Sequence, residues 1–174
     1  QEMVYRTIEG TFGHVFKLID VDLPEQFPRM TYADALSRYG SDKPDLRFEL
    51  ELVDLSDQLR DTDFAPFADT LKANGQIKCF VVKAKADYSR KQLDELQEFV
   101  KRYGAGALAW IKLGQDETTS SLLKVLGQTK IEQLASVANA EKGDAVMIVG
   151  GRKSIVAASL GALRLEIARR ENLI

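Results

Sequence analysis

The side chains most able to do chemistry in this sequence are concentrated in one charged string, residues 39–48. It reads Tyr-Gly-Ser-Asp-Lys-Pro-Asp-Leu-Arg-Phe. A hydroxyl, carboxylates and cations this close together could position charged substrate groups. Covalent catalysis would also need a base within reach of Ser41, and the string contains no histidine to act as one. Local pattern alone therefore predicts a charged loop without a nucleophile and base pair.

The single cysteine and the single histidine do not extend this set. Cys79 stands between Lys78 and Phe80 in an apolar run, where we expect a small buried side chain rather than a reactive thiolate. His14 has no cysteine or second histidine near it, so a packing or surface role is expected rather than metal ligation. One cysteine also excludes an intramolecular disulfide and a cysteine metal cluster.

Acidic and glycine-rich strings lack the spacing of metal and nucleotide sites. The acidic run has no glycine or glutamate at the positions that a calcium loop requires. It consists of Asp54, Asp57, Asp61 and Asp63. Residues 104–106 follow a helical pattern and precede a strand, the reverse of a dinucleotide loop. Residues 149–154 run from strand to helix but lack the Gly-Lys-Ser/Thr of a phosphate loop. We therefore expect no catalytic, cofactor-binding or metal-binding residue.

Composition and charge limit the classes of protein. The chain has 174 residues, of which 45% are hydrophobic and 29% charged, as in ordinary globular proteins with a sizeable core. It contains no apolar run of membrane-spanning length and no signal peptide pattern, so we expect a cytoplasmic protein without a membrane partner. A net charge of −2 argues against DNA binding and against a main role in holding a nucleic-acid backbone.

The charged string lies between two periodicities. Before it, residues 31–34 match a capping box that opens a short helix. After it, apolar and charged residues alternate over 46–52, the period of a strand with one buried face. Gly40 can end the helix in the left-handed conformation, and Pro44 keeps Lys43 extended. The local interpretation is a loop that joins a helix to an amphipathic strand.

The rest of the chain predicts a small sheet and its covering helices. Expected strands are 76–84, 107–113 and 144–149. Expected helices are 2–19, a segment ending at 74–75, one capped by Ser89 with Gln92, one opened by a capping box at 129–132, and a largely apolar one from 152. The strand–helix–strand order predicts that 76–84 and 107–113 run parallel in one sheet. The fold class is thus α/β (α+β), with a small mixed sheet covered by helices.

Four strings, in order, resemble bacterial-type aspartyl-tRNA synthetases. The charged string resembles the segment that follows the second class II motif of that family. The others are Ser-Arg-Lys-Gln at 89–92, the stretch 103–112 that contains Tyr-Gly-Ala and Leu-Ala-Trp-Ile-Lys, and Gly-Ala-Leu-Arg at 161–164. The resemblance covers nearly the whole chain and is least distinctive at 56–75.

The resemblance implies a parent enzyme that attaches aspartate to tRNA using ATP and magnesium, usually as a homodimer. The arginines and carboxylates of that family's catalytic motifs do not occur here. The resemblance therefore implies a remnant of the class II catalytic domain at 1–55, a GAD-type insertion domain at 56–150, and a helix returning to the catalytic domain at 151–174. Neither end carries a start or stop signal, so we expect a piece cut from a longer chain, inactive alone.

The resemblance also assigns residues. Its signature positions are Tyr39, Gly40, Ser41, Asp42, Lys43, Pro44, Asp45 and Arg47. Arg90 and Lys91 are candidate tRNA contacts, because the insertion lies on the tRNA side in that family. Against this, each stands four residues before an acidic residue, a spacing that favours ion pairs on a solvated face.

Two other assignments stay open. One is the GAD domain of a tRNA-dependent amidotransferase, against which the charged string argues because it belongs to the synthetase scaffold. The other is a stand-alone α/β interaction module. Whether the parent charges only aspartate tRNA or asparagine tRNA as well does not follow from the sequence.

Overall fold

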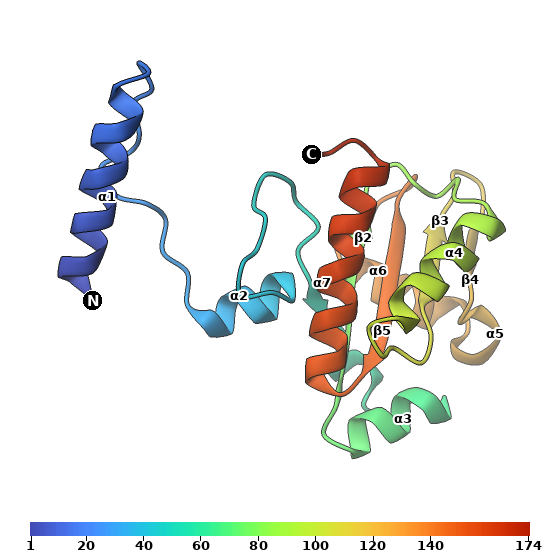
Figure 1. Cartoon of the computed structure of the whole chain (residues 1–174). Coiled ribbons are helices and arrows are strands. Elements are labelled where there is room, and N and C mark those ends of the chain that lie inside the picture. The colour runs from blue at the N-terminus through green and yellow to red at the C-terminus, as the bar shows by residue number, and fades with distance from the viewer. The chain divides into compact units, whose positions relative to one another are not determined.

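The computed structural model describes all 174 residues, and they form two compact units, 1–31 and 32–174. The first unit contains α1 (Glu2–Lys17), drawn in blue in Figure 1. This confirms the helix expected near residues 2–19. Glu9 accepts a hydrogen bond from the Phe27 backbone N–H at 3.0 Å, so the segment after the helix folds back on it.

No residue of α1 is buried within its unit. Its large apolar side chains follow a helical spacing and stay exposed: Met3, Val4, Tyr5, Ile8, Phe12 and Val15. Isolated helices of this length are marginal in water, because most helical stability comes from packing of an apolar face. The stability of α1 therefore depends on what covers this face.

The second unit is built on a five-stranded sheet with strand order β1-β2-β5-β3-β4. The strands are β1 (Val53–Asp54), β2 (Gln76–Val82), β3 (Ala109–Leu113), β4 (Thr118–Ser120) and β5 (Ala145–Gly151). β2 and β3 run parallel to each other, as expected, because both pair antiparallel with β5. The expectation of a mixed sheet is wrong in one respect: β5 separates the two parallel strands, so every neighbouring pair is antiparallel.

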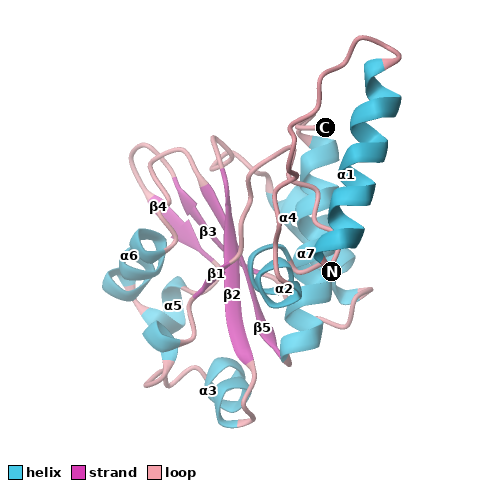
Figure 2. Cartoon of the chain, turned by 90° about the vertical axis from the view of Figure 1, so that its left-hand side faces the viewer, coloured by secondary structure: helices cyan, strands magenta, loops and turns pink.

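Helices cover both faces of this sheet, which confirms the α/β class (Figure 2). One face carries α2 (Tyr32–Tyr39), α4 (Arg90–Lys101) and α7 (Lys153–Arg170). The other carries α3 (Ala65–Lys72), α5 (Leu123–Leu126) and α6 (Gln128–Val137), with a short 3-10 turn at Asp57–Leu59. No helix has the length and apolar character needed to span a membrane.

Two apolar cores follow from the alternation of side chains along the strands. On the α4 and α7 face, Phe80 and Met147 pack with Leu160. On the other face, Cys79 and Ile148 pack with the α6 side of the molecule. Burial of each large aliphatic or aromatic side chain stabilises the fold by about 1.5–3 kcal/mol.

The strand expected at 46–52 is wrong. Only Val53 and Asp54 pair with β2, and the preceding backbone leaves the sheet with Leu50 at φ 73°. Leu50 and Leu52 are nevertheless buried and Phe48 is partly buried, but Leu46 is exposed, so the alternation marks the inward side chains correctly only from Phe48 onward. The Leu52 N–H donates to the Arg38 carbonyl oxygen at 2.7 Å, and the Leu50 carbonyl accepts a hydrogen bond from a buried arginine on α7, described below.

Of the capping boxes expected at 89–92 and 129–132, the first forms and the second does not. Ser89 and Gln92 form the expected capping box at the start of α4. The capping box expected at 129–132 does not form, because α6 begins at Gln128 with Gly127 as N-cap at φ 76°. Glycine adopts that conformation freely, so the helix starts two residues earlier than expected, without a side-chain cap.

Candidate functional site

The charged string follows the end of α2, where the chain lies directly against α7. Gly40 has φ 70°, and a Cβ there would lie 2.3 Å from the Ala157 carbonyl oxygen. A Cβ on Gly161 of α7 would lie 2.7 Å from the Gly40 carbonyl oxygen. Two of the strings that carry the resemblance therefore touch each other, and their glycines permit the contact.

Arg164, one turn after Gly161, fixes the backbone that follows the string. It is 1% exposed, and its guanidinium donates hydrogen bonds to the carbonyl oxygens of Leu50, Asp45 and Glu49, each at 3.1 Å. Burial lowers the pKa of Arg164. Buried charges persist in proteins where polar atoms surround them, and here backbone oxygens do so. The segment 45–50 accordingly wraps around one guanidinium instead of forming a strand.

Aromatic rings complete the surroundings of this guanidinium. Its central carbon lies 4.4 Å from the centre of the Phe48 ring and 4.9 Å from that of Tyr39. Contacts of a cation with ring faces at this range are attractive and strengthen as water is excluded. Residues of the charged string thus form a cradle around Arg164.

Glu51 ties the string back to α2. Arg38 donates two hydrogen bonds to its carboxylate, at 2.7 and 3.0 Å, and the Tyr39 hydroxyl donates a third at 2.9 Å. The hydrogen bonds from Arg38 lower the pKa of Glu51, despite the opposing effect of burial. Glu51 therefore stays ionised at neutral pH and holds structure rather than exchanging protons.

A second ion pair lies within the string itself. The Arg47 guanidinium approaches the Asp45 carboxylate to 2.6 Å and, with the Arg47 backbone N–H, lowers the pKa of Asp45 to about 2. By contrast, Asp42 and Lys43 are exposed and form no ion pair. The Lys43 backbone N–H donates to the Ser41 hydroxyl at 3.1 Å, which shapes a turn at this tip. Asp42 and Lys43 are the charges in the string that can meet another molecule.

The cysteine is buried, and two carboxylates of the acidic run form hydrogen bonds or ion pairs within the protein. Cys79 is fully buried, and burial raises the pKa of its thiol to about 12. In the acidic run, Asp54 accepts the Ser56 N–H at 2.8 Å and Asp57 pairs with Arg60 at 2.7 Å. No three cysteine, histidine, aspartate or glutamate side chains are grouped so as to hold a metal ion.

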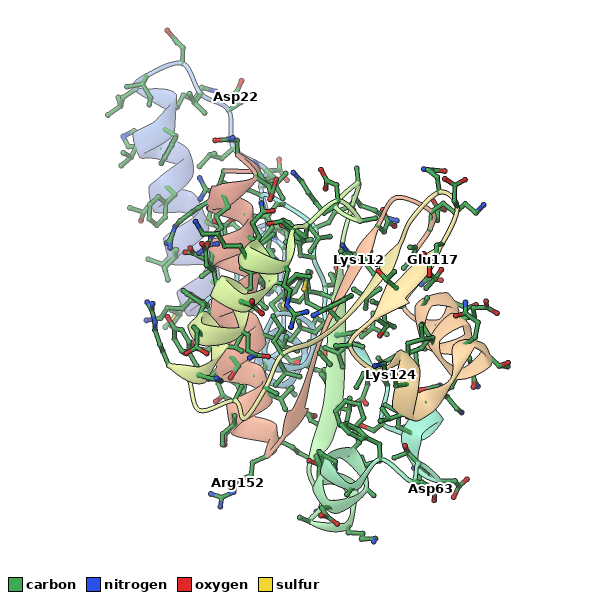
Figure 3. All side chains as sticks on the ribbon, turned by 90° about the vertical axis from the view of Figure 1, so that its right-hand side faces the viewer. Asp22, Asp63, Lys112, Glu117, Lys124 and Arg152 are labelled. Atoms are coloured by element: carbon green, nitrogen blue, oxygen red, sulfur yellow. The ribbon has the colours of Figure 1, made fainter.

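Three further side chains that could do chemistry are exposed on the surface. Asp63, at the end of the acidic run, points away from the protein in Figure 3, and His14 is exposed. Arg152, in the glycine-rich turn before α7, points away from the protein at the lower left of the same view. The Arg152 guanidinium is therefore directed away from the turn at 149–154.

The ion pairs on the exposed face of α4 differ from those that the sequence spacing predicts. Lys101 pairs with Glu98 at 2.6 Å as the spacing predicts, but Glu95 pairs with Arg170 of α7 at 3.4 Å. Arg90 and Lys91 consequently have no carboxylate within 4 Å. Lys91 lines an open groove of about 710 Å³ between α4 and α7, whose wall also contains Asp94, Glu95, Glu98 and Glu166. The groove also contains Arg102 and Arg170, and Arg170 pairs with both Glu95 and Glu166, so its charges are mixed. The two candidate contacts are thus unpaired cations, of which Lys91 lines a groove of mixed charge.

Sequence reasoning missed the residues that organise the string. Arg164 was part of a resembling tetrapeptide but received no role, and Arg38 and Glu51 were not selected. One signal for Arg164 was visible: a lone arginine stands on an apolar helix face between Leu160 and Ile167. Lys78 is similar, since its buried amine donates to the Ser37 carbonyl at 2.7 Å and desolvation lowers its pKa.

Comparisons with known proteins support the resemblance to aspartate–tRNA ligases. The model of the family described as "GAD domain" matches residues 67–160. Over 176 residues the chain is 49% identical to the aspartate–tRNA ligase of Staphylococcus saprophyticus, and over 177 residues 44% identical to that of Clostridium beijerinckii. It is 44% identical over 178 residues to the aspartate–tRNA(Asp/Asn) ligase of Anoxybacillus flavithermus. These alignments cover 100% of this chain but only 29–30% of the relatives.

Proposed function

The chain belongs to the GAD domain family, and we propose that it is the part of an aspartate–tRNA ligase that contains the insertion domain and supplies no catalytic group. The observation that carries this proposal is the use of the charged string. Arg164 of α7 binds backbone carbonyl oxygens of the string and of the residues that follow it. Glu51 binds Arg38 and Tyr39 of α2, and the ionised Asp45 and Arg47 pair with each other within the string. Groups engaged in this way are scaffold, not acid–base catalysts.

The activity of the whole protein is inferred from its relatives. Proteins similar over the full length of this chain are named aspartate–tRNA ligases, and the chain spans about 30% of their length. We therefore propose a cytoplasmic, homodimeric parent enzyme that uses ATP and magnesium to attach aspartate to tRNA. The ATP and magnesium sites would lie in the part of the parent that this chain does not contain.

The division of the chain is part of the proposal. Residues 1–55 would belong to the catalytic domain, 56–150 to the insertion, and 151–174 to a helix that returns to the catalytic domain. The family match at 67–160 supports the position of the insertion. The exposed apolar face of α1 supports a missing partner surface for the first segment, because helices of this kind are stable when that face is covered.

A tRNA contact at Arg90 and Lys91 belongs to the same proposal for the whole enzyme. Both cations are exposed and unpaired, which favours a phosphate contact. The four carboxylates that line the groove with Lys91 oppose it, since they reduce the local attraction for phosphates, although Arg102 and Arg170 in the same groove offset part of this effect. We propose that the isolated chain binds tRNA weakly and that the contact contributes only when the rest of the enzyme holds the tRNA.

A chimera tests the proposal. This chain would replace the 176 matching residues of the Staphylococcus saprophyticus enzyme, and tRNA aspartylation would be compared with that of the unmodified relative. We expect the chimera to charge tRNA with aspartate, because the replaced segment is scaffold. A chimera that is folded and dimeric but inactive would contradict the proposal. The same graft carrying Asp42→Asn and Lys43→Gln is a matched control for a chemical role of the string's exposed tip, and we expect it to remain active.

The two alternative assignments have less support. Similarity to aspartate–tRNA ligases extends on both sides of the region matched by the family model, over the entire chain. A GAD domain taken from an amidotransferase, or a stand-alone interaction module, does not account for that extent.

A further inference from the structure

β2 extends beyond the end of β1 and leaves an open sheet edge at Val81. β1 pairs with β2 over two residues, with Val53 opposite Cys79. On this side the Ile77 carbonyl accepts a hydrogen bond from the Leu55 N–H at 2.8 Å. Successive peptide groups along a strand point to opposite sides, so the N–H and C=O of Val81 point to the same side as those of Ile77. Val81 lies past Val53, the residue at which β1 begins, so β1 does not pair with it.

The open edge forms one wall of a groove. The groove has a volume of about 710 Å³, and Val81, Val82 and Lys83 line it from β2. Residues 47–51 line the opposite wall, with Leu173 and Asn139 at the ends. The backbone that departs from the sheet before β1 therefore faces the edge with which a longer β1 would pair.

The sequence of this segment suits that edge. Continuing the observed register from Val53 places Glu51 opposite Val81, Leu50 opposite Val82 and Glu49 opposite Lys83. Apolar residues would face each other at one pair and opposite charges at another, both of which stabilise neighbouring strands. Leu50 and Val82 already belong to the same apolar core, so pairing would move the backbone and leave the buried side chains in place.

Three features hold the segment away from the sheet. The Glu51 carboxylate accepts hydrogen bonds from Arg38 and Tyr39 of α2, which closure would have to break. Arg164 binds the carbonyl oxygens of Asp45, Glu49 and Leu50. Leu50 adopts φ 73°, a left-handed conformation that is unfavourable for leucine because its Cβ crowds the following carbonyl. The hydrogen bonds to Arg164 thus offset backbone strain at the residue where β1 would otherwise continue.

We propose that residues 47–52 are a strap that closes onto the open edge of β2, with Arg164 as the latch that keeps it open. Closure extends β1 as far as Glu49, fills the groove and pairs the backbone of Glu51 with that of Val81. It also detaches the charged string from α7, so movement of α7 and pairing of the strap are coupled. The proposal rests on the fold alone and does not depend on the function of the parent enzyme.

Amide hydrogen exchange of the whole chain, followed by NMR, tests the strap. In the wild type the Val81 amide should exchange faster than those of Phe80 and Val82, which face β5. Leu50→Ile keeps the volume of the core but introduces a β-branched residue that resists positive φ. We expect about tenfold slower exchange of the Val81 amide in this variant, as an added strain of the size typical for left-handed residues would produce.

The control variant is Leu50→Met, which is unbranched and should leave exchange at Val81 unchanged. Arg164→Met removes the latch and should protect Val81 in the same way as Leu50→Ile. If Arg164→Met fails to fold, the comparison of Leu50→Ile with Leu50→Met decides alone. A folded Leu50→Ile variant with unchanged Val81 exchange would overturn the proposal, as would a wild-type Val81 amide protected as strongly as its neighbours.

Discussion

Replacement of Gly161 by alanine should destabilise the second unit although it improves the helix. In an exposed helix interior, glycine to alanine stabilises by about 1 kcal/mol. Here the added methyl would lie 2.7 Å from the Gly40 carbonyl oxygen and 3.1 Å from that of Tyr39. Both contacts are backbone atoms, so no side chain can rotate away. Overpacking of this kind costs about 1–3 kcal/mol.

The same shift disturbs a second set of bonds. Arg164 lies three residues after Gly161, and separating α7 from the string stretches its hydrogen bonds to Asp45, Glu49 and Leu50. Hydrogen bonds of charged groups contribute about 1.5–3 kcal/mol each, so partial loss is enough to outweigh the helical gain. We expect the free energy of unfolding to fall by about 2 kcal/mol in total, from overpacking and these weakened bonds.

Thermal and urea unfolding of the whole chain measure this effect. For a chain of this size, about 2 kcal/mol corresponds to a decrease in Tm of roughly 4–8 °C. Gly106→Ala is the matched control, because a Cβ there has no atom within 4 Å. It should leave Tm unchanged or raise it slightly. A Gly161→Ala variant as stable as the wild type would refute the close approach of α2 and α7.

Three further predictions concern charge and exposure. Asp45 has its pKa lowered from 3.8 to about 2, so its ion pair stabilises the fold above about pH 4 and is lost as the pH falls through 2; Asp45→Asn should flatten the decrease in Tm over this range, and an unchanged slope would exclude the pair as its cause. The isolated chain should bind aspartate tRNA no more tightly than about 10⁻⁴ M at physiological salt; micromolar binding abolished by Arg90→Glu with Lys91→Glu would contradict this. Amides of α1 should exchange faster in the monomer than those of β2 and β5, because no α1 residue is buried; equally slow exchange in both would show that α1 is stable without a covering surface.

The sequence predicted helices and strands best where neighbouring residues alone determine the local structure. The Ser89–Gln92 capping box involves neighbouring residues, and the helix begins where it predicts. β5 and the end of β2 from Cys79 to Val82 are apolar on both faces, because helices cover both faces of the sheet. These elements need no knowledge of distant partners.

Prediction failed where a distant residue competes for the same groups. The alternation at 46–52 marks a strand, but Arg164, more than one hundred residues away, binds its carbonyl oxygens. Lys91 has Glu95 at helical spacing, yet Glu95 pairs with Arg170 on the neighbouring helix. Periodicity correctly predicted that Leu50 and Leu52 face inward, but not that Leu46 is exposed. It also does not show which backbone or charged groups tertiary contacts will bind.

The central claim is that this chain belongs to an aspartate–tRNA ligase and contributes scaffold rather than chemistry. Its most direct test is aspartate-dependent exchange of pyrophosphate into ATP, measured on the purified chain and on the chimera with the Staphylococcus saprophyticus enzyme. Activation of a carboxylate by ATP needs positioned cations and metal around the phosphates. We predict no exchange with the chain alone and exchange with the chimera. Exchange by the 174 residues alone, or a folded chimera without exchange, would contradict the account.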